Sequence, residues 1–305
     1  MSVSQAERFR RESQAEVAYR YLPGIGEPVL LVHGVGADQQ TWQLIPTQLQ
    51  AAGRAVITVD LLGHGDTAAQ GDDFSLSAQA AMVRDLIDHL GVDRVHLVGH
   101  SVGGGISMQF AAESPERVSS LTLISSGGLG REVSGSLRAS LLPGSASAIG
   151  VMTHQVVTVP MRQVIRLLAL VGVENRDFSE RTVDALERLQ DRGRRRAFLE
   201  TLRSVVGLTG QRLSVLDHLE ILDPGRLLII WGEADPMVPV EHGRRLNELL
   251  PGSRLVLIPE AGHEPYVDDP EIIVREILAH TASNLDRWQP VDLTVWERQA
   301  TVRPL

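Results

Sequence analysis

The sequence predicts an α/β fold: a doubly wound, mostly parallel sheet with helices on both faces, interrupted by a helical insertion. Short apolar runs recur along the chain, and each is nearly continuous rather than alternating, as in strands buried on both faces of a parallel sheet. Helical patterns separate several of these runs, and strand–helix alternation is typical of doubly wound sheets. The alternation breaks once, between residues 124 and 227.

The expected strands are the apolar runs 29–32, 55–59, 95–98, 121–124, 227–231 and 255–258. Between the second and third runs, residues 77–90 carry apolar side chains on one helical face. We expect Ser77 to cap the start of this helix and Gly91 to end it.

The interrupted region contains no convincing strand, and it predicts helices at about 158–171, 179–192 and 194–206. We therefore expect residues 1–126 and 224–283 to form one α/β core and residues 127–223 to form a helical lid over it. Residues 284–305 form a C-terminal tail, and the sequence leaves open whether it docks on the core.

The composition excludes several classes of function. The formal net charge is −9, which disfavours nucleic acid as a partner, and the single dense basic run, 192–196, is interpreted as one solvated helix face. The absence of cysteine excludes disulfides, zinc–thiolate sites and cysteine nucleophiles. No metal-ligand spacing such as H-E-x-x-H occurs, so we expect neither metal nor organic cofactor.

The N-terminus lacks the apolar core of a signal peptide, and no stretch is long and apolar enough to span a membrane. We therefore expect a cytoplasmic protein with no membrane span. The expected partner is a small-molecule substrate, and a homodimer is one option for the oligomeric state.

A candidate nucleophile follows the third apolar run. Residues 99–103 read Gly-His-Ser-Val-Gly and precede a helix-compatible stretch, and this strand–turn–helix context gives the short G-x-S-x-G motif its value. Such a turn strains the backbone of Ser101 and lifts its hydroxyl above the carboxyl edge of the sheet. We expect Gly99, Gly103 and Gly104 to leave room for the turn.

A serine hydroxyl needs a base, and His263 lies in the loop after the last apolar run. The base needs an acid to orient it, and Asp235 follows the run that ends at residue 231. Glu233 is the nearby competitor, but Asp235 leads directly into Pro236, where the chain turns. The order Ser, Asp, His at successive strand ends can converge on one point.

An oxyanion hole requires backbone N–H donors, and we expect them from Val35 and Val102. His33 and His64 lie in strand-end loops near the same edge, where we interpret them as structural hydrogen-bonding residues.

Five segments, HGVG, DLLGHGD, GHSVGG, GEADPMVP and AGHEP, resemble the α/β-hydrolase fold superfamily in their order and spacing. The resemblance covers about residues 15–126 and 224–283. It implies Ser101 as nucleophile, Asp235 as acid, His263 as base, and the amides of Val35 and Val102 as the oxyanion hole. It implies no particular substrate, because this fold hosts many chemistries.

Differences from subfamily patterns narrow the choice of reaction. Haloalkane dehalogenases and epoxide hydrolases of this fold use aspartate where Ser101 stands, so both reactions are disfavoured. The meta-cleavage C–C hydrolases usually carry proline in an HGxGPG loop and tryptophan after the histidine, where this chain has Ala37-Asp38 and Glu264. Cofactor-free haloperoxidases share the three residues, with oxidation as a side reaction of an esterase.

The predicted function is hydrolysis of a carboxylic ester of small to medium size through an acyl-enzyme. The alternatives are a C–C bond or lactone hydrolase with the same three residues and, from another class, a ligand-binding receptor on this fold. We expect the apolar stripe of the lid (Val156, Val157, Val159, Met161, Val164, Leu167, Leu168) to roof the pocket. The expected substrate contacts are Gly34, His100, Val159 and Leu167.

Overall fold

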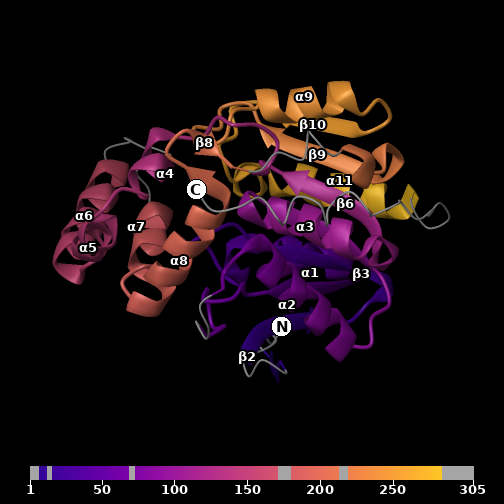
Figure 1. Cartoon of the computed structure of the whole chain (residues 1–305), viewed down its shortest axis with the longest axis horizontal. Coiled ribbons are helices and arrows are strands. Elements are labelled where there is room, and N and C mark those ends of the chain that lie inside the picture. Colours follow the sequence, from indigo (N-terminus) through magenta and orange to yellow (C-terminus); the bar gives the residue numbers. More distant parts are fainter. Residues whose placement is uncertain (1–6, 12–15, 69–72, 171–179, 213–218, 284–305) are drawn as a thin grey trace, which may run out of the picture.

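The computed structural model describes residues 7–11, 16–68, 73–170, 180–212 and 219–283. Its centre is an eight-stranded sheet in the order β1-β2-β4-β3-β5-β6-β9-β10 (Figure 1). The strands are β1 (Glu7–Arg10), β2 (Glu16–Leu22), β3 (Ile25–Val32), β4 (Arg54–Val59), β5 (Val95–His100), β6 (Val118–Ile124), β9 (Leu227–Gly232) and β10 (Arg254–Ile258). From β4 to β10 every neighbouring pair is parallel, whereas β1 and β2 form an antiparallel edge.

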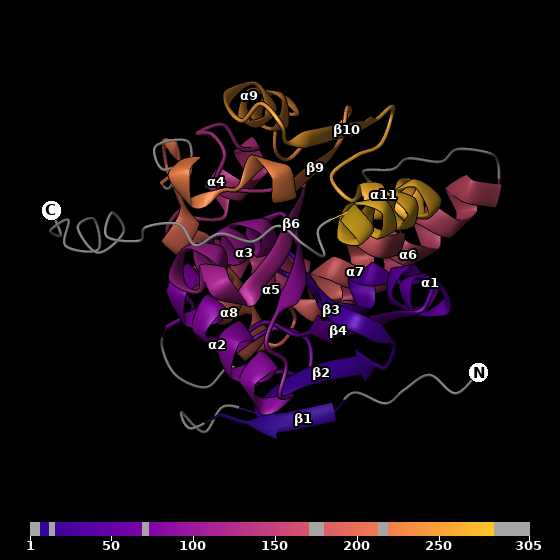
Figure 2. The same cartoon turned by 90° about the vertical axis from the view of Figure 1, so that its right-hand side faces the viewer.

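Helices cover both faces of this sheet. Figure 2 shows α2 and α3 on one side and α1 and α11 on the other. The helices that pack on the sheet are α1 (Ile45–Ala51), α2 (Leu76–His89), α3 (Val102–Glu113), α9 (Glu241–Leu249), α10 (Pro265–Asp268) and α11 (Pro270–Ser283). The predicted doubly wound α/β fold is confirmed.

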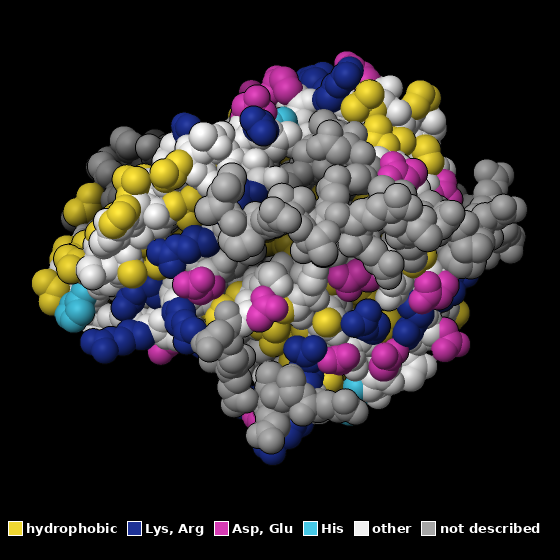
Figure 3. Space-filling model, in the orientation of Figure 1, with side chains coloured by type: hydrophobic (Ala, Val, Ile, Leu, Met, Phe, Trp, Pro, Cys, Tyr) yellow, Lys and Arg dark blue, Asp and Glu magenta, His cyan; other side chains and the backbone are white. Residues whose placement is uncertain are grey.

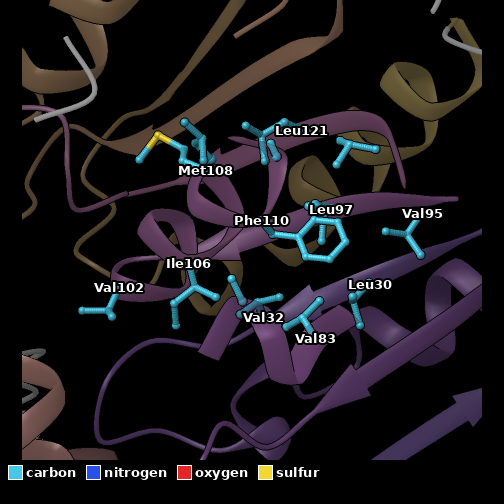
Figure 4. Packing of buried hydrophobic residues seen from close by; sticks show 14 of the residues in the cluster. Leu30, Val32, Val83, Val95, Leu97, Val102, Ile106, Met108, Phe110 and Leu121 are labelled. Atoms are coloured by element: carbon cyan, nitrogen blue, oxygen red, sulfur yellow. The ribbon is translucent and has the colours of Figure 1, made fainter. Parts of the chain in front are cut away.

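The core explains why the strands read as continuous apolar runs. Successive residues of a strand point to opposite faces, and Leu30 and Val32 join a cluster with α2 and α3, while Val29 and Leu31 join another with α1 and α11. Figure 4 shows the first cluster, where side chains of α2 and α3 pack on those of the strands. Both faces of the central strands are therefore buried, and the few polar side chains inside them are buried as well, as with Ser120 and Thr122 of β6.

The six predicted strands are present, but β1 and β2 were not predicted from the sequence. The first helix begins earlier than predicted, because the side chain of Ser75, not Ser77, accepts a hydrogen bond from the N–H of Ala78 and caps α2. Gly91 adopts φ +64° directly after the C-cap, as a helix-ending glycine does.

The segment between β6 and β9, called the insertion here, is mostly helical among its described residues. It contains α4 (Gly135–Ala139), α5 (Ser145–Met152), α6 (Gln155–Leu170), α7 (Glu180–Arg188) and α8 (Arg192–Val205). It also contains a short antiparallel pair that was not predicted, β7 (Val206–Gly207) with β8 (Gly210–Gln211). Within the described ranges, no helix is long and apolar enough to cross a membrane. The tail, 284–305, lies outside the described residues.

Candidate active site

Ser101 occupies a strained turn between β5 and α3. Its backbone angles are φ 54° and ψ −120°, a conformation that L-residues rarely adopt. Three backbone hydrogen bonds hold the turn: the Ser101 N–H donates to the carbonyl of Ile124, and its carbonyl accepts from the N–H groups of Gly104 and Gly127. The strain raises the side chain at the carboxyl edge of the sheet, where the sequence predicted it.

The three predicted glycines make this turn possible by allowing close approach. A Cβ on Gly99 would lie 2.4 Å from the carbonyl oxygen of Gly103, one on Gly103 would lie 2.3 Å from that of Val32, and one on Gly104 would lie 2.1 Å from Ser126 Oγ. None of these positions tolerates a side chain without movement. The start of α3 therefore sits directly against the end of β3, which brings the loop after β3 close to the turn that carries Ser101.

Ser101, His263 and Asp235 form a continuous hydrogen-bonded line. His263 Nδ1 lies 2.8 Å from Asp235 Oδ2, and Nε2 lies 3.0 Å from Ser101 Oγ. A carboxylate only accepts, so Nδ1 carries the proton and Nε2 presents its lone pair to the serine hydroxyl. This is the arrangement in which a histidine can remove the serine proton.

The Asp235 side chain is fully buried and stays ionised because its carboxylate oxygens accept several hydrogen bonds. Burial by itself would raise the pKa of this carboxyl, but hydrogen bonds from His263 and from the N–H groups of Val238 and Met237 lower it below its ordinary value. Glu233, the competing candidate, instead forms an ion pair with Arg244 at 2.6 Å. The structure therefore places Asp235, not Glu233, on the histidine.

The His100 ring packs against His263 and contacts its backbone. Its Nε2 donates a hydrogen bond of 2.8 Å to the backbone carbonyl of His263, and its Nδ1 lies 3.3 Å from the Tyr266 hydroxyl. Burial lowers the pKa of His100 to about 3, so the ring is neutral. The hydrogen bond joins residues 163 positions apart and fixes the backbone that carries the base.

The loop after β3 is held by His33. Its Nδ1 donates to the carbonyl of Gly34 at 2.8 Å, and its Nε2 accepts from the N–H of Leu61 at 3.1 Å. Both ring nitrogens are thus used structurally. Four histidines share deep burial that lowers their pKa values to about 3 or 4, and they are His33, His64, His96 and His100.

A cavity of about 510 Å³, counted with its opening, reaches Ser101, and Val35 and Val102 also line it. Val102 is the first residue of α3, and the first N–H groups of a helix have no intrahelical acceptor. The remaining lining is largely apolar and comes from the core and from the insertion: Leu76, Gly105, Gly127, Gly128, Val133, Leu137, Leu202, Val205, Val206, Gln211 and Val238.

The insertion is tied to the core around this cavity. Arg188 of α7 forms an ion pair of 2.8 Å with Asp38, in the loop that follows Val35. A Cβ on Gly36 would lie 3.2 Å from the ring of Phe198 in α8, so that helix packs directly on the same loop. Gln211 Oε1 accepts a hydrogen bond from the N–H of Gly128.

The structure differs from the sequence prediction in the expected substrate contacts. Gly34 packs against the His100 ring and the Ser101 Cβ, because a Cβ there would lie 3.1 Å from each, and neither Gly34 nor His100 lines the cavity. Val159 is 48% exposed on α6 and does not line it either. The side chain of Leu167 lies outside the described residues.

Among the described residues, α4 and α8 rather than α6 contribute to the insertion side of the cavity, through residues such as Leu137 and Leu202. Of the α6 stripe, Val156, Val157, Val159 and Val164 are exposed and Met161 does not line the cavity, while the side chains of Leu167 and Leu168 lie outside the described residues. An apolar side chain on a helix indicates that it packs on something, but not on which surface. The short helix α4 has no apolar periodicity that would have predicted it from the sequence. Among the described residues no cluster of three potential metal ligands occurs.

This chain is similar in sequence to a known protein family and to individual proteins. A model of the alpha/beta hydrolase family matches residues 29–276. An uncharacterized protein of Mycobacterium tuberculosis is 34% identical over 266 residues, which cover 86% of this chain and 77% of that protein. Lipase 1 of Psychrobacter immobilis is 25% identical over 270 residues, which cover 87% and 78% of the two chains.

Among solved structures, the meta-cleavage product hydrolase CumD of Pseudomonas fluorescens superposes with a TM-score of 0.68 at 21% sequence identity. The superposition covers 88% of this chain and 95% of that one. At this identity the likeness concerns the fold.

Proposed function

Because the chain belongs to the alpha/beta hydrolase family, we propose that it hydrolyses a carboxylic ester of small to medium size through an acyl-enzyme on Ser101. The observation that carries the proposal is the line from Asp235 through His263 to Ser101 at the wall of an apolar cavity. The lipase relative is consistent with an ester as the substrate.

In the first half-reaction, Ser101 Oγ attacks the ester carbonyl while His263 Nε2 takes the hydroxyl proton. The negative charge that develops on the carbonyl oxygen is accepted by the N–H groups of Val35 and Val102, each contributing about 3 kcal/mol. The C–O bond then breaks, His263 returns its proton to the leaving alcohol, and the acyl group remains on Ser101.

In the second half-reaction, His263 takes a proton from water, and the resulting hydroxide attacks the acyl-enzyme. The tetrahedral intermediate uses the same two N–H groups. Its collapse returns the proton to Ser101 and releases the carboxylic acid. Asp235 remains ionised throughout, holds Nδ1 in its protonated form and stabilises the imidazolium.

The cavity chemistry favours an uncharged ester over an anionic C–C substrate. The described residues that line it include no lysine, arginine or histidine, so none supplies a positive side chain for the carboxylate of a meta-cleavage product. Gln211 is the one amide side chain in this lining, and its own hydrogen bonds go to the backbone of Gly128 and Glu132. The insertion, as the lid in this proposal, sets the acyl length through Leu137 and Leu202.

The test measures hydrolysis rates of p-nitrophenyl esters from acetate to decanoate, with Ser101→Ala as the matched variant. We expect turnover that peaks at one chain length and falls about a million-fold in the variant. A fluorophosphonate probe should label the natural chain at Ser101 and leave the variant unlabelled. Labelling without ester turnover, but with cleavage of vinylogous diketone acids, would establish the C–C alternative. If the protein shows no labelling and no turnover, the receptor alternative is the one that remains.

A further inference from the structure

The outer side of the insertion exposes an unusual amount of apolar surface. Ten large hydrophobic side chains are exposed among the described residues, and six of them lie on α5 and α6: Val151, Met152, Val156, Val157, Val159 and Val164. Val156 is 75% exposed and Val151 is 67% exposed. Single exposed hydrophobic residues are normal on a monomer, but a contiguous group marks an interaction surface.

A cationic groove borders this apolar surface. The groove runs between α5 and α8, and Val151 lines it together with four arginines: Arg192, Arg195, Arg196 and Arg203. Glu200 also lines it and forms an ion pair with Arg203 at 3.0 Å, so arginines outnumber acidic residues among the described residues that line the groove. In Figure 3, hydrophobic side chains gather over α5 and α6 and basic side chains lie beside them over α8.

We propose that this outer face, the exposed residues of α5 and α6 with the arginine groove, docks on an anionic phospholipid bilayer. The arginines match the negative headgroup phosphates, and the valines and Met152 match the acyl region beneath them. The whole chain carries a net charge of −9, so the same bilayer repels the rest of the surface and orients the protein with this face toward the lipid.

Charge and composition favour lipid over a second copy of the chain. Face-to-face pairing of two copies would bring two arginine grooves together, whereas a bilayer supplies the opposite charge. Residues 142–170 contain no phenylalanine, tyrosine or tryptophan, the side chains that are enriched in protein interfaces. Fluid acyl chains accommodate aliphatic side chains without a complementary protein surface.

The test is co-sedimentation of Ser101→Ala protein with vesicles of phosphatidylcholine, alone or mixed with phosphatidylglycerol, at low salt. The alanine variant prevents ester hydrolysis, so the result is independent of the proposed function. We expect binding only to the mixed vesicles, weakened by added salt. Arg192→Gln with Arg196→Gln should lower partitioning about 25-fold, since each charge near the surface contributes roughly fivefold.

Val151→Gln with Val156→Gln should lower partitioning by about tenfold through lost apolar burial. Two matched substitutions lie outside the outer face: Ile25→Gln, which is 81% exposed, and Arg245→Gln on α9, which is 59% exposed. These controls should bind like the parent, and the thermal midpoints of all variants should agree.

Three results would overturn the proposal. The first is that the protein remains in the supernatant with anionic vesicles at low salt, or that the outer-face variants bind like the controls. The second is that light scattering shows a dimer which Val151→Gln with Val156→Gln dissociates, with no binding to vesicles, so that a second copy occupies the face. The third is that the natural chain binds inorganic phosphate, that Arg192→Gln with Arg196→Gln abolishes this binding, and that the protein does not bind vesicles, so that the groove takes free anions.

Discussion

Replacement of His100 by alanine tests whether a buried side chain, outside the three residues to which we assign the reaction, affects the rate by positioning one of them. The imidazole donates its Nε2 proton to the backbone carbonyl of His263 at 2.8 Å and is 3% exposed. The variant removes this donor and leaves the carbonyl buried. It also removes the ring that packs against His263, whose centroid lies 4.9 Å away.

The cost follows from these contacts. A buried carbonyl without a donor costs about 1–3 kcal/mol, so the backbone of His263 should shift toward another partner. The His263 Nε2 to Ser101 Oγ distance is 3.0 Å, and a displacement on the order of 1 Å breaks that hydrogen bond and lowers the rate about 100-fold. Since His100 does not line the cavity, the loss should fall on kcat while KM changes little.

The assay is steady-state hydrolysis of a p-nitrophenyl ester by the parent, His100→Ala and His100→Gln. Glutamine places an N–H the same number of bonds from the backbone, so it should recover most of kcat if the donor matters. A thermal melt checks folding. The reasoning is refuted if folded His100→Ala keeps the parental kcat, or if both variants lose activity equally.

Three further predictions concern stability and the acid. Asp235→Asn cannot hold the proton on Nδ1 of His263 and should lower kcat about 10⁴-fold without unfolding the protein, as ester kinetics and circular dichroism would show. Gly103→Ala should lower the free energy of unfolding by about 3 kcal/mol in urea titrations, while Gly135→Ala, with open space around it, should raise it by less than about 1 kcal/mol. The four buried histidines have pKa values below the roughly 6.5 of the unfolded chain, so the unfolded state binds more protons and stability falls as the pH drops through about 6.5 toward 3. Between about pH 7.5 and 5.5 each of these histidines lowers the stability by about 1.4 kcal/mol, and Asp60, whose pKa burial raises to about 6, opposes them by about 1 kcal/mol, so urea titrations at these two pH values should differ by roughly 4 kcal/mol.

The sequence predicted the fold best where an apolar run of residues corresponds to a strand buried in the sheet. A strand buried on both faces is largely apolar, so the six parallel strands could be predicted, and the residues that follow them share one edge of the sheet. The edge strands β1 and β2 carry mixed polar residues, as in Glu7–Arg10, and such short segments give no clear period.

The cavity walls could not be predicted in the same way. Leu137 in the five-residue helix α4 has no periodicity to reveal it, yet it lines the cavity, while the strongly apolar α6 presents Val156 and Val164 to solvent. The contact between His100 and His263 depends on the turn geometry of two loops, which single-sequence patterns do not encode. Residue type suggested the chemistry that we propose, but packing decided which side chains line the cavity and which contact His263.

Helix α8 links the two proposals and determines how their tests must be interpreted. Leu202 and Val205 line the cavity beside Ser101, whereas Arg192 and Arg196 line the groove on the outer face. Phe198, between these two sets, packs on Gly36 in the loop that carries a predicted oxyanion donor. A substitution that displaced α8 would therefore alter ester turnover and vesicle binding together. Loss of vesicle binding by the arginine variants identifies a surface contact only if those same changes, made with Ser101 intact, leave ester kinetics in vesicle-free buffer unchanged.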